Sequence, residues 1–337
     1  MFESVPDQNG AALLRSWRAR LRAPLIASPM FIASGPELVT AQCIAGVIGS
    51  FPALNARSAT QLDEWLSQIG EALAAHDRDH PYGTSAPLAV NLVCHRSNLR
   101  LDDDLALCVK HRVPLVISSM GARQDINQAV HAYGGVTLHD VTTQAHARKA
   151  IAKGATGLIA VAAGAGGHAG RTSPFALIAE IRQWFDGPLV LAGAIGNGRA
   201  IAAARLLGAD FAYVGSPFIA TSEAMVTDAQ KQGMIEAGAD DIVYTPAFSG
   251  TAANYLRSSI VAQGLDPDAL PQSRRAIDAD NQGKAIRTWS DIWGCGQGVG
   301  SVREVLPAAA LIDRMVAEYR TALGEAAALA QAPGAAW

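Results

Sequence analysis

Eight short apolar runs, separated by segments with helical spacing, constrain the fold of this chain more than any other feature. Each run is rich in valine, isoleucine, leucine or alanine and is bounded by glycine or proline, as buried strands are. Strands that alternate with helices form parallel βαβ units, and eight such units close a (β/α)8 TIM barrel of the α/β class. A doubly wound open sheet is the alternative. The runs are 24–27, 46–49, 87–93, 113–117, 135–139, 157–161, 188–192 and 210–214.

The alternation breaks near residue 240, and this break sets the predicted domain organisation. Prolines and a late glycine cluster replace the βα rhythm up to Gly300. Residues 305–323 have the spacing of a closing helix, and the alanine-rich residues 324–337 are expected to fray. The predicted parts are an N-terminal extension (1–23), a barrel (24–235), a lid or insertion over the barrel mouth (236–303) and a C-terminal helix with its tail (304–337).

Composition and charge exclude several classes of function. The net charge is -3 and no basic block is present, which argues against nucleic acid as a partner. The four cysteines have no Cys-x-x-Cys pairing and no zinc-like spacing, so we expect free thiols and no metal site. Because no signal-like or membrane-spanning apolar run occurs, the predicted location is the cytoplasm.

A glycine-rich segment with one histidine follows the sixth apolar run. Glycines 164, 166, 167 and 170 surround His168, just past the carboxyl end of the predicted strand, where barrel enzymes place their chemistry. Glycine lets a backbone approach a ligand closely, and histidine titrates near neutral pH. His168 is therefore a candidate general base. A structural histidine on a surface turn is the alternative.

Two glycine turns follow the seventh and eighth apolar runs, at Gly193-Ala194 and Gly215-Ser216. In a (β/α)8 barrel these two loops form the common phosphate site, where backbone N–H groups bind the phosphate oxygens. A Rossmann site is disfavoured because the first βα turn lacks Gly-x-Gly-x-x-Gly. The alternative is that Gly193 and Gly215 only end their strands.

Several short segments of this chain resemble the nitronate monooxygenases, formerly called 2-nitropropane dioxygenases. They are residues 164–170, 191–195, 207–210 and 214–218, together with Glu223 and residues 296–298. The resemblance implies a barrel that binds FMN non-covalently and oxidises alkyl nitronates or nitroalkanes with O2 to carbonyl compounds and nitrite. It places the phosphate at Gly193, Ala194, Gly215 and Ser216, and the catalytic base at His168. The residues it places near the flavin ring are Pro29, Met30, Asn91, His139, Gly166, Gly167 and Gln297.

Two residues depart from the pattern of that family. Ala194 stands where many relatives carry glycine, although it keeps its N–H group. Asp140 stands where some relatives place lysine near the flavin, and a carboxylate there would oppose the negative charge of reduced flavin unless it points away. The contacts expected at His139 and Asp140 are therefore the least secure part of the implied site.

Other functions share the same framework. NAD(P)H-dependent flavin reductases, namely enoyl-acyl-carrier-protein or quinone reductases, are the main enzymatic alternative, and a non-catalytic barrel that binds flavin or a phosphorylated ligand is the second. IMP dehydrogenase-like barrels need a cysteine nucleophile, and even Cys94 lacks a suitable turn. A homodimer is left open as the oligomeric state. Candidates for an apolar substrate pocket, or for ordinary core packing, are Met30, Phe31, Tyr244, Phe248 and Tyr255.

Overall fold

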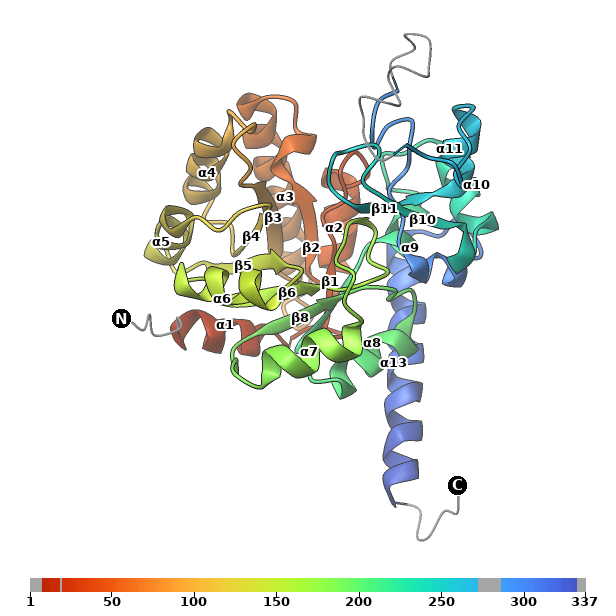
Figure 1. Cartoon of the computed structure of the whole chain (residues 1–337). Helices are drawn as coiled ribbons and strands as arrows, with labels where there is room; N and C mark the ends of the chain where they lie inside the picture. The colour runs from red at the N-terminus through yellow and green to blue at the C-terminus, as the bar shows by residue number, and fades with distance from the viewer. Residues whose placement is uncertain (1–7, 19, 272–285, 332–337) are drawn as a thin grey trace.

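The computed structural model describes residues 8–18, 20–271 and 286–331. Eight parallel strands form one sheet in the order β1-β9-β8-β6-β5-β4-β3-β2, and a parallel bridge between Ile26 and Ile48 joins its two edges. The sheet is thus a (β/α)8 barrel, as predicted, and not an open sheet (Figure 1). Its strands are β1 Leu25–Ala27, β2 Gly49–Pro52, β3 Leu88–Val93, β4 Leu115–Ser119, β5 Val136–Val141, β6 Gly157–Val161, β8 Leu189–Ala192 and β9 Phe211–Val214.

Seven helices follow the strands and cover the outside of the barrel. Ser58, Thr143 and Asn197 cap three of them, because each side chain accepts a backbone N–H of the first helical turn. The largest difference from the predicted strands is at β2. This strand begins at residue 49 and not 46, because Gly46 has a φ of +84° and belongs to the turn after α2. The helices are α2 Pro36–Ile44, α3 Ala59–Asp79, α4 Leu101–Lys110, α5 Gln124–Ala132, α6 Gln144–Ala152, α7 Pro174–Arg182 and α8 Gly198–Leu206.

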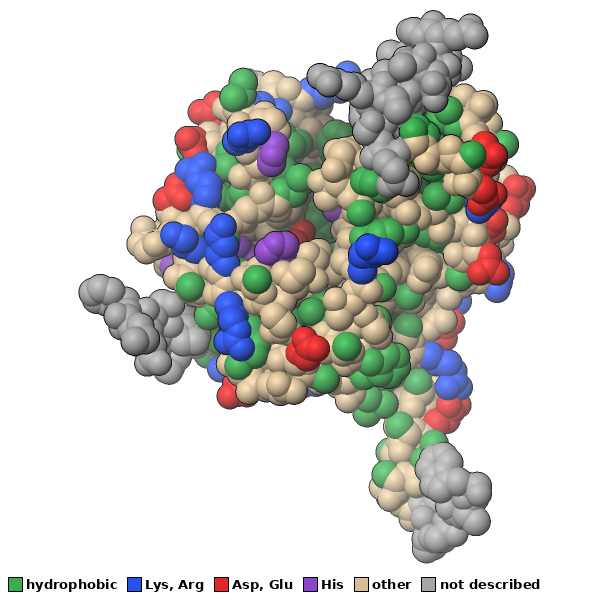
Figure 2. Space-filling view, in the orientation of Figure 1, with side chains coloured by type: hydrophobic (Ala, Val, Ile, Leu, Met, Phe, Trp, Pro, Cys, Tyr) green, Lys and Arg blue, Asp and Glu red, His purple; other side chains and the backbone are tan. Residues whose placement is uncertain are grey.

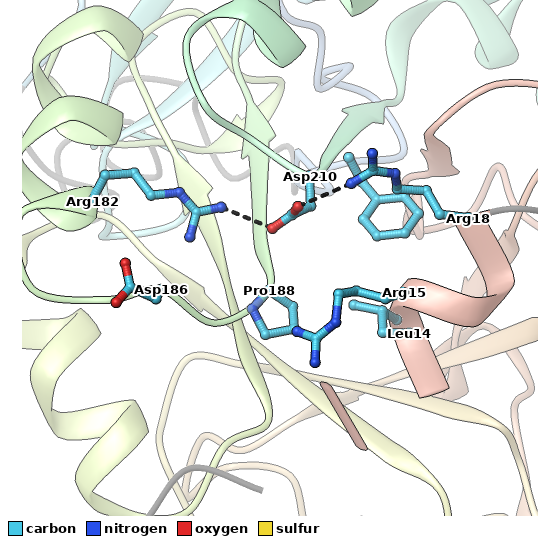
Figure 3. Close-up of a pocket in the computed structure, with 8 residues that line it drawn as sticks. Leu14, Arg15, Arg18, Arg182, Asp186, Pro188 and Asp210 are labelled. Atoms are coloured by element: carbon cyan, nitrogen blue, oxygen red, sulfur yellow. Dashed lines mark hydrogen bonds and ion pairs between the residues drawn. The ribbon is translucent and has the colours of Figure 1, made fainter. Parts of the chain in front are cut away.

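The N-terminal end of the barrel is closed by helix α1 (Gln8–Arg18). Its Leu14 and Trp17 pack into the apolar cluster inside the barrel. Asp210 binds Arg182 at 2.8 Å and Arg18 at 3.3 Å, beside a cavity of about 230 Å³ (Figure 3). Because ion pairs and a helix occupy this end, the opposite end, at the carboxyl termini of the strands, is the one left for chemistry.

A polar layer lies on top of the apolar interior at those carboxyl termini. Successive side chains of a strand point to opposite faces, so the residue two positions after an interior residue also points inward. The interior cluster contains Ala89, Ile117, Leu138 and Phe211, and each is followed two residues later by a polar side chain. We call these four residues the polar layer: Asn91 on β3, Ser119 on β4, Asp140 on β5 and Tyr213 on β9.

A second sheet lies beside the barrel in Figure 1, where the sequence predicts an insertion without a regular βα unit. It has three antiparallel strands in the order β10-β11-β7, and β7 (Gly167–His168) comes from the glycine-rich loop itself. The βα rhythm is absent because the strands are short and antiparallel. The boundaries of the predicted lid stay a prediction, and its residues 272–285 lie outside the described ranges. The other elements are α9 Ser216–Ile219, α10 Asp228–Glu236, β10 Ile242–Thr245, β11 Ala253–Leu256 and α11 Arg257–Ala262.

The closing helix α13 runs from Ala308 to Gln331, further than predicted. Alanine is the best helix former, so the alanine-rich segment expected to fray stays helical through residue 331, and 332–337 lie outside the described residues. The helix packs on α8, where a Cβ on Gly198 would lie 2.1 Å from the Met315 carbonyl oxygen. Among the described helices, none is long and apolar enough to cross a membrane.

Candidate active site

The carbonyl oxygen of Gly164 joins three loops at the barrel mouth. It accepts the backbone N–H of Ala194 at 3.2 Å and that of Gln297 at 2.9 Å. Gly164 follows β6, Ala194 follows β8, and Gln297 begins the 3-10 turn Gln297–Ser301. The structure therefore brings together three segments that the sequence places far apart, and Gln297 keeps an exposed side chain there.

Several glycines of the site serve contact between backbones. A Cβ on Gly166 would lie 2.9 Å from the Gly296 nitrogen, and one on Gly296 would lie 2.7 Å from the Gly164 oxygen. A Cβ on Gly193 would lie 2.7 Å from the Ala163 oxygen. The sequence predicts that Gly166 and Gly193 make room for a ligand, but the packing of loop on loop already requires glycine at both positions.

Gly215 is different, because neither its backbone nor its neighbours require glycine. Its φ is -116°, outside the left-handed region that favours glycine. A Cβ would make ordinary contacts with Ser28 at 3.4 Å and with the Met30 sulfur at 3.7 Å. The missing Cβ thus leaves a small cradle between Gly215, Ser28 and Met30, which fits the presence of a ligand group.

Two other predicted phosphate contacts are already engaged within the protein. The Ala194 N–H, expected to be available, donates to the Gly164 carbonyl, and Ala194 has the left-handed φ of +54°. The Ser216 hydroxyl accepts the Gly296 N–H at 2.9 Å. Both residues hold the loops of the mouth together, and this leaves Gly215 as the predicted phosphate residue beside which a Cβ would fit without displacing its neighbours.

The polar layer contains a chain of hydrogen bonds that ends at Asp140. Asn91 Nδ2 donates to Ser119 Oγ at 2.5 Å, and Ser119 Oγ donates to Asp140 Oδ2 at 2.7 Å. Asp140 Oδ1 and the Tyr213 hydroxyl are buried without a hydrogen-bond partner in the described part of the chain. Buried polar atoms are seldom left unpaired, so these two atoms also fit a layer that faces a bound molecule.

His139 does not lie at this site, contrary to expectation. Its ring is 1% exposed and faces outward to helix α5, where Nε2 lies 2.9 Å from Asn127 Oδ1. Burial lowers the pKa of His139 to about 4, so the ring is neutral. The alternation of β5 turns His139 away from the mouth and turns Asp140 into it. The carboxylate of Asp140, whose direction the sequence left open, therefore points toward the mouth.

The loop after β1, with Pro29 and Met30, is held by a residue that sequence reasoning missed. Asn55 donates to the carbonyl oxygens of Met30 at 3.0 Å and Ser34 at 2.8 Å, and accepts the Ile32 N–H at 2.9 Å. Pro29 and Met30 are half-buried. An asparagine 25 residues after Met30 carries no local signal in the sequence.

Aromatic candidates for the apolar pocket fall into two groups. Phe31 and Tyr244 are 48% and 38% exposed. Phe248 and Tyr255 are buried in the apolar cluster beside β11, so core packing describes them better. Figure 2 shows the surface hollowed between the barrel and the second sheet, with histidine and acidic side chains in the hollow.

His168 lies on β7, opposite Ala253 of β11. Its Nε2 is 3.0 Å from Ser249 Oγ, and the Trp289 ring meets its ring edge-on, with centroids 5.3 Å apart. Burial lowers the pKa of His168, so the imidazole is neutral at pH 7. Neither Ser249 nor Trp289 was found from the sequence, because each meets His168 only through the folding of the second sheet.

The hydrogen bonds of Ser249 determine which nitrogen of His168 carries the proton. The Ser249 hydroxyl has one hydrogen, which it donates to the Thr251 carbonyl at 2.8 Å. It accepts the Tyr255 O–H at 3.1 Å. No hydrogen remains for His168, so His168 Nε2 must donate and Nδ1 keeps the lone pair. The ring is thus a neutral imidazole with its basic nitrogen free of protein hydrogen bonds in the described ranges.

Comparison with known proteins shows to which family the chain belongs. A family model described as "Nitronate monooxygenase" matches residues 16–318. This chain belongs to the nitronate monooxygenase family of oxidoreductases. A nitronate monooxygenase from Paraburkholderia phytofirmans is 26% identical, covering 89% of this chain and 93% of that protein. An octahydroindene-carboxyl-CoA dehydrogenase from Mycobacterium tuberculosis is 27% identical over 71% of this chain, but the matched part spans only 64% of that dehydrogenase.

Solved structures share the fold. A nitroalkane oxidase from Streptomyces ansochromogenes has a TM-score of 0.76 and 24% identity, and covers 92% of this chain and 99% of its own. FabK from Thermotoga maritima has a TM-score of 0.75 and 22% identity, and covers 94% of this chain and 98% of its own. At these identities the likeness concerns the fold of barrel and second sheet together.

Proposed function

We propose that this chain is an FMN-dependent enzyme that oxidises alkyl nitronates or nitroalkanes with O2 to carbonyl compounds and nitrite. Membership of the nitronate monooxygenase family supports the class of substrate. The observation that carries the chemistry is the state of His168, which lies on the loop that follows β6. Its imidazole is neutral and is oriented by Ser249.

His168 is the proposed general base. A nitro group acidifies the hydrogen on its α carbon, and a neutral nitroalkane must lose that proton before it can be oxidised. The lone pair of His168 Nδ1 accepts the proton, while Nε2–H stays bonded to Ser249. Because the hydroxyl of Ser249 also binds Thr251 and Tyr255, the ring keeps its orientation as it becomes charged.

Bound FMN would supply the electron-transfer chemistry between the substrate carbanion and O2. The cradle at Gly215 would hold the phosphate end, with Ser28 and Met30 beside it. The polar layer, with Asn91 and Asp140, would lie under the ring or the substrate. A single phosphate cradle without a dinucleotide fingerprint favours FMN over FAD, and mass spectrometry of the heat-released cofactor tests this choice.

A comparison of the neutral nitroalkane with its nitronate distinguishes the role of His168 as a base from the roles of the other site residues. His168→Asn should keep the bound flavin spectrum and lose about a hundredfold to ten-thousandfold in kcat/KM for a neutral nitroalkane. The preformed nitronate of the same compound needs no deprotonation, so it should keep a larger share of its activity. O2 uptake and nitrite release are the measurements. Equal losses on both forms would contradict the assignment of the base.

A second candidate is chemistry next to a thioester: a reduction with NAD(P)H as the reductant, or the reverse dehydrogenation with an electron acceptor such as NAD(P)⁺. The relative from Mycobacterium tuberculosis, which is named as an octahydroindene-carboxyl-CoA dehydrogenase, favours it. A thioester also acidifies its α carbon, so the same histidine could serve. Rapid bleaching of the flavin by NAD(P)H without O2, together with no nitrite from nitroalkanes, would favour this second function. The cytoplasmic location and the homodimer stay predictions.

A further inference from the structure

Asp140 Oδ1 and the Tyr213 hydroxyl form an unassigned pair at the barrel mouth. They lie on β5 and β9, and neither has a hydrogen-bond partner among the described residues. The Ser28 hydroxyl is near enough to Tyr213 to lower its pKa somewhat but lies outside hydrogen-bonding geometry. Burial, with a smaller contribution from Asp140, raises the pKa of Tyr213 well above its usual range. Tyr213 belongs to the apolar cluster inside the barrel, and Asp140, two residues after Leu138 of that cluster, points inward as well.

The donors and acceptors of this pair define what it can bind. The Tyr213 hydroxyl can donate one hydrogen bond to an oxygen of a ligand. Asp140 Oδ2 already accepts from Ser119, so Oδ1 is the remaining atom. A protonated Oδ1 donates a second hydrogen bond, whereas an ionised carboxylate repels a ligand oxygen. A planar group with two oxygens, such as nitro, nitronate or carboxylate, matches the pair only while Asp140 carries a proton.

Nothing else in the polar layer supplies a compensating positive charge. Asn91 and Ser119 are uncharged, and burial raises the pKa of Cys94, which follows β3, so that thiol stays neutral as Tyr213 does. Burial raises the pKa of Asp140 to about 6, and the Ser119 hydrogen bond only partly opposes it. His168, on the neighbouring loop, is the other group of the mouth that titrates below neutral pH.

We infer that Asp140 and Tyr213 recognise a planar two-oxygen group, and that an anionic form of this group binds together with one proton on Asp140. For a nitronate this inference rests on the proposed function; the carbonyl edge of a flavin ring presents the same acceptor chemistry. The affinity for an uncharged nitro compound differs less between the two protonation states of Asp140. The site thus favours neutral substrates as the pH rises.

Isobutyrate tests the inference, because it has the shape and charge of propyl-2-nitronate and does not react. Isobutyramide is the matched uncharged probe. Isothermal titration calorimetry of the FMN-loaded protein between pH 6 and 8.5 should show isobutyrate affinity falling about tenfold per pH unit above the pKa of Asp140. Titrations in buffers of different ionisation enthalpy should report one proton taken up per isobutyrate. Isobutyramide affinity should stay flat.

Variants assign the proton. Asp140→Asn should abolish the pH dependence and the proton uptake, His168→Asn should preserve both, and Tyr213→Phe should weaken both probes at every pH without changing the slope. If the flavin ring occupies the pair, isobutyrate should bind only the flavin-free protein, with the same slope. A slope that survives in Asp140→Asn, or the absence of isobutyrate binding with and without flavin, would overturn the inference. None of these outcomes depends on nitroalkane turnover.

Discussion

Replacing Asp140 with asparagine should stabilise the protein at neutral pH, and the size of the gain follows from its surroundings. The pKa of Asp140 rises from 3.8 to about 6 because the carboxyl is buried with one hydrogen-bond donor. A raised pKa means that the folded state holds a proton that the unfolded chain has released. The resulting stability is fully present below pH 3.8 and is lost as the pH rises through about 6. Each pH unit corresponds to 1.36 kcal/mol, so the loss is about 3 kcal/mol.

Asparagine keeps the acceptor for Ser119 and has no charge to bury. Asp140→Asn should therefore raise the free energy of unfolding by about 2–3 kcal/mol at pH 8 and change it little at pH 4. Urea unfolding followed by tryptophan fluorescence at both pH values measures the difference. The exposed Asp79, at the end of α3, provides a matched Asp→Asn control that should stay within about 0.5 kcal/mol. A gain at pH 8 no larger than at pH 4 would refute the buried charge.

Substitutions at three further residues test the site. Ser249→Ala should leave His168 as a mixture of tautomers, and Ser249→Thr should restore the Nε2–H form; ¹⁵N NMR of the ring reads the tautomer directly, and one unchanged tautomer in Ser249→Ala would contradict the hydrogen-bond count. Gly215→Val should weaken FMN binding by filling the cradle, so flavin fluorescence titrations that match the parent would place the phosphate elsewhere. Ala194→Gly should relieve a φ of +54° and add up to about 1 kcal/mol to the unfolding free energy; a lower melting temperature would contradict that strain.

The barrel could be predicted because its signal is local. Each strand is an apolar run and each helix has its own spacing and cap, so their positions depend on residues close in sequence. Gly46 shows where local reading ends, because the turn after α2 takes this residue from the apolar run. The second sheet escaped prediction for the opposite reason. β7 has only two residues, and it exists because β11, more than eighty residues later, pairs with it.

The site was predictable to the level of loops and not of atoms. The glycine loop, the turn with Gly193 and Ala194, and Gln297 meet because backbone hydrogen bonds bring them together, and their contacts with a flavin stay a prediction. The period of a strand decides whether His139 or Asp140 faces the mouth, and a range misjudged by one residue reverses that choice. Ser249 could not be found at all, since its link to His168 spans 81 residues of chain.

The sharing of β7 between the glycine-rich loop and the second sheet has a mechanical consequence. Any movement that separated the sheet from the barrel would either pull on β7, which carries His168, or break the pairing of β7 with β11 and the contact of His168 with Ser249. A separation of the second sheet that widened the barrel mouth would thus also disturb the proposed base, so we expect the enzyme to be inactive while the sheet is displaced. For the same reason, replacing the second sheet with that of a relative should give a folded protein only when the glycine-rich loop is replaced with it. The two segments form one sheet and have to match each other.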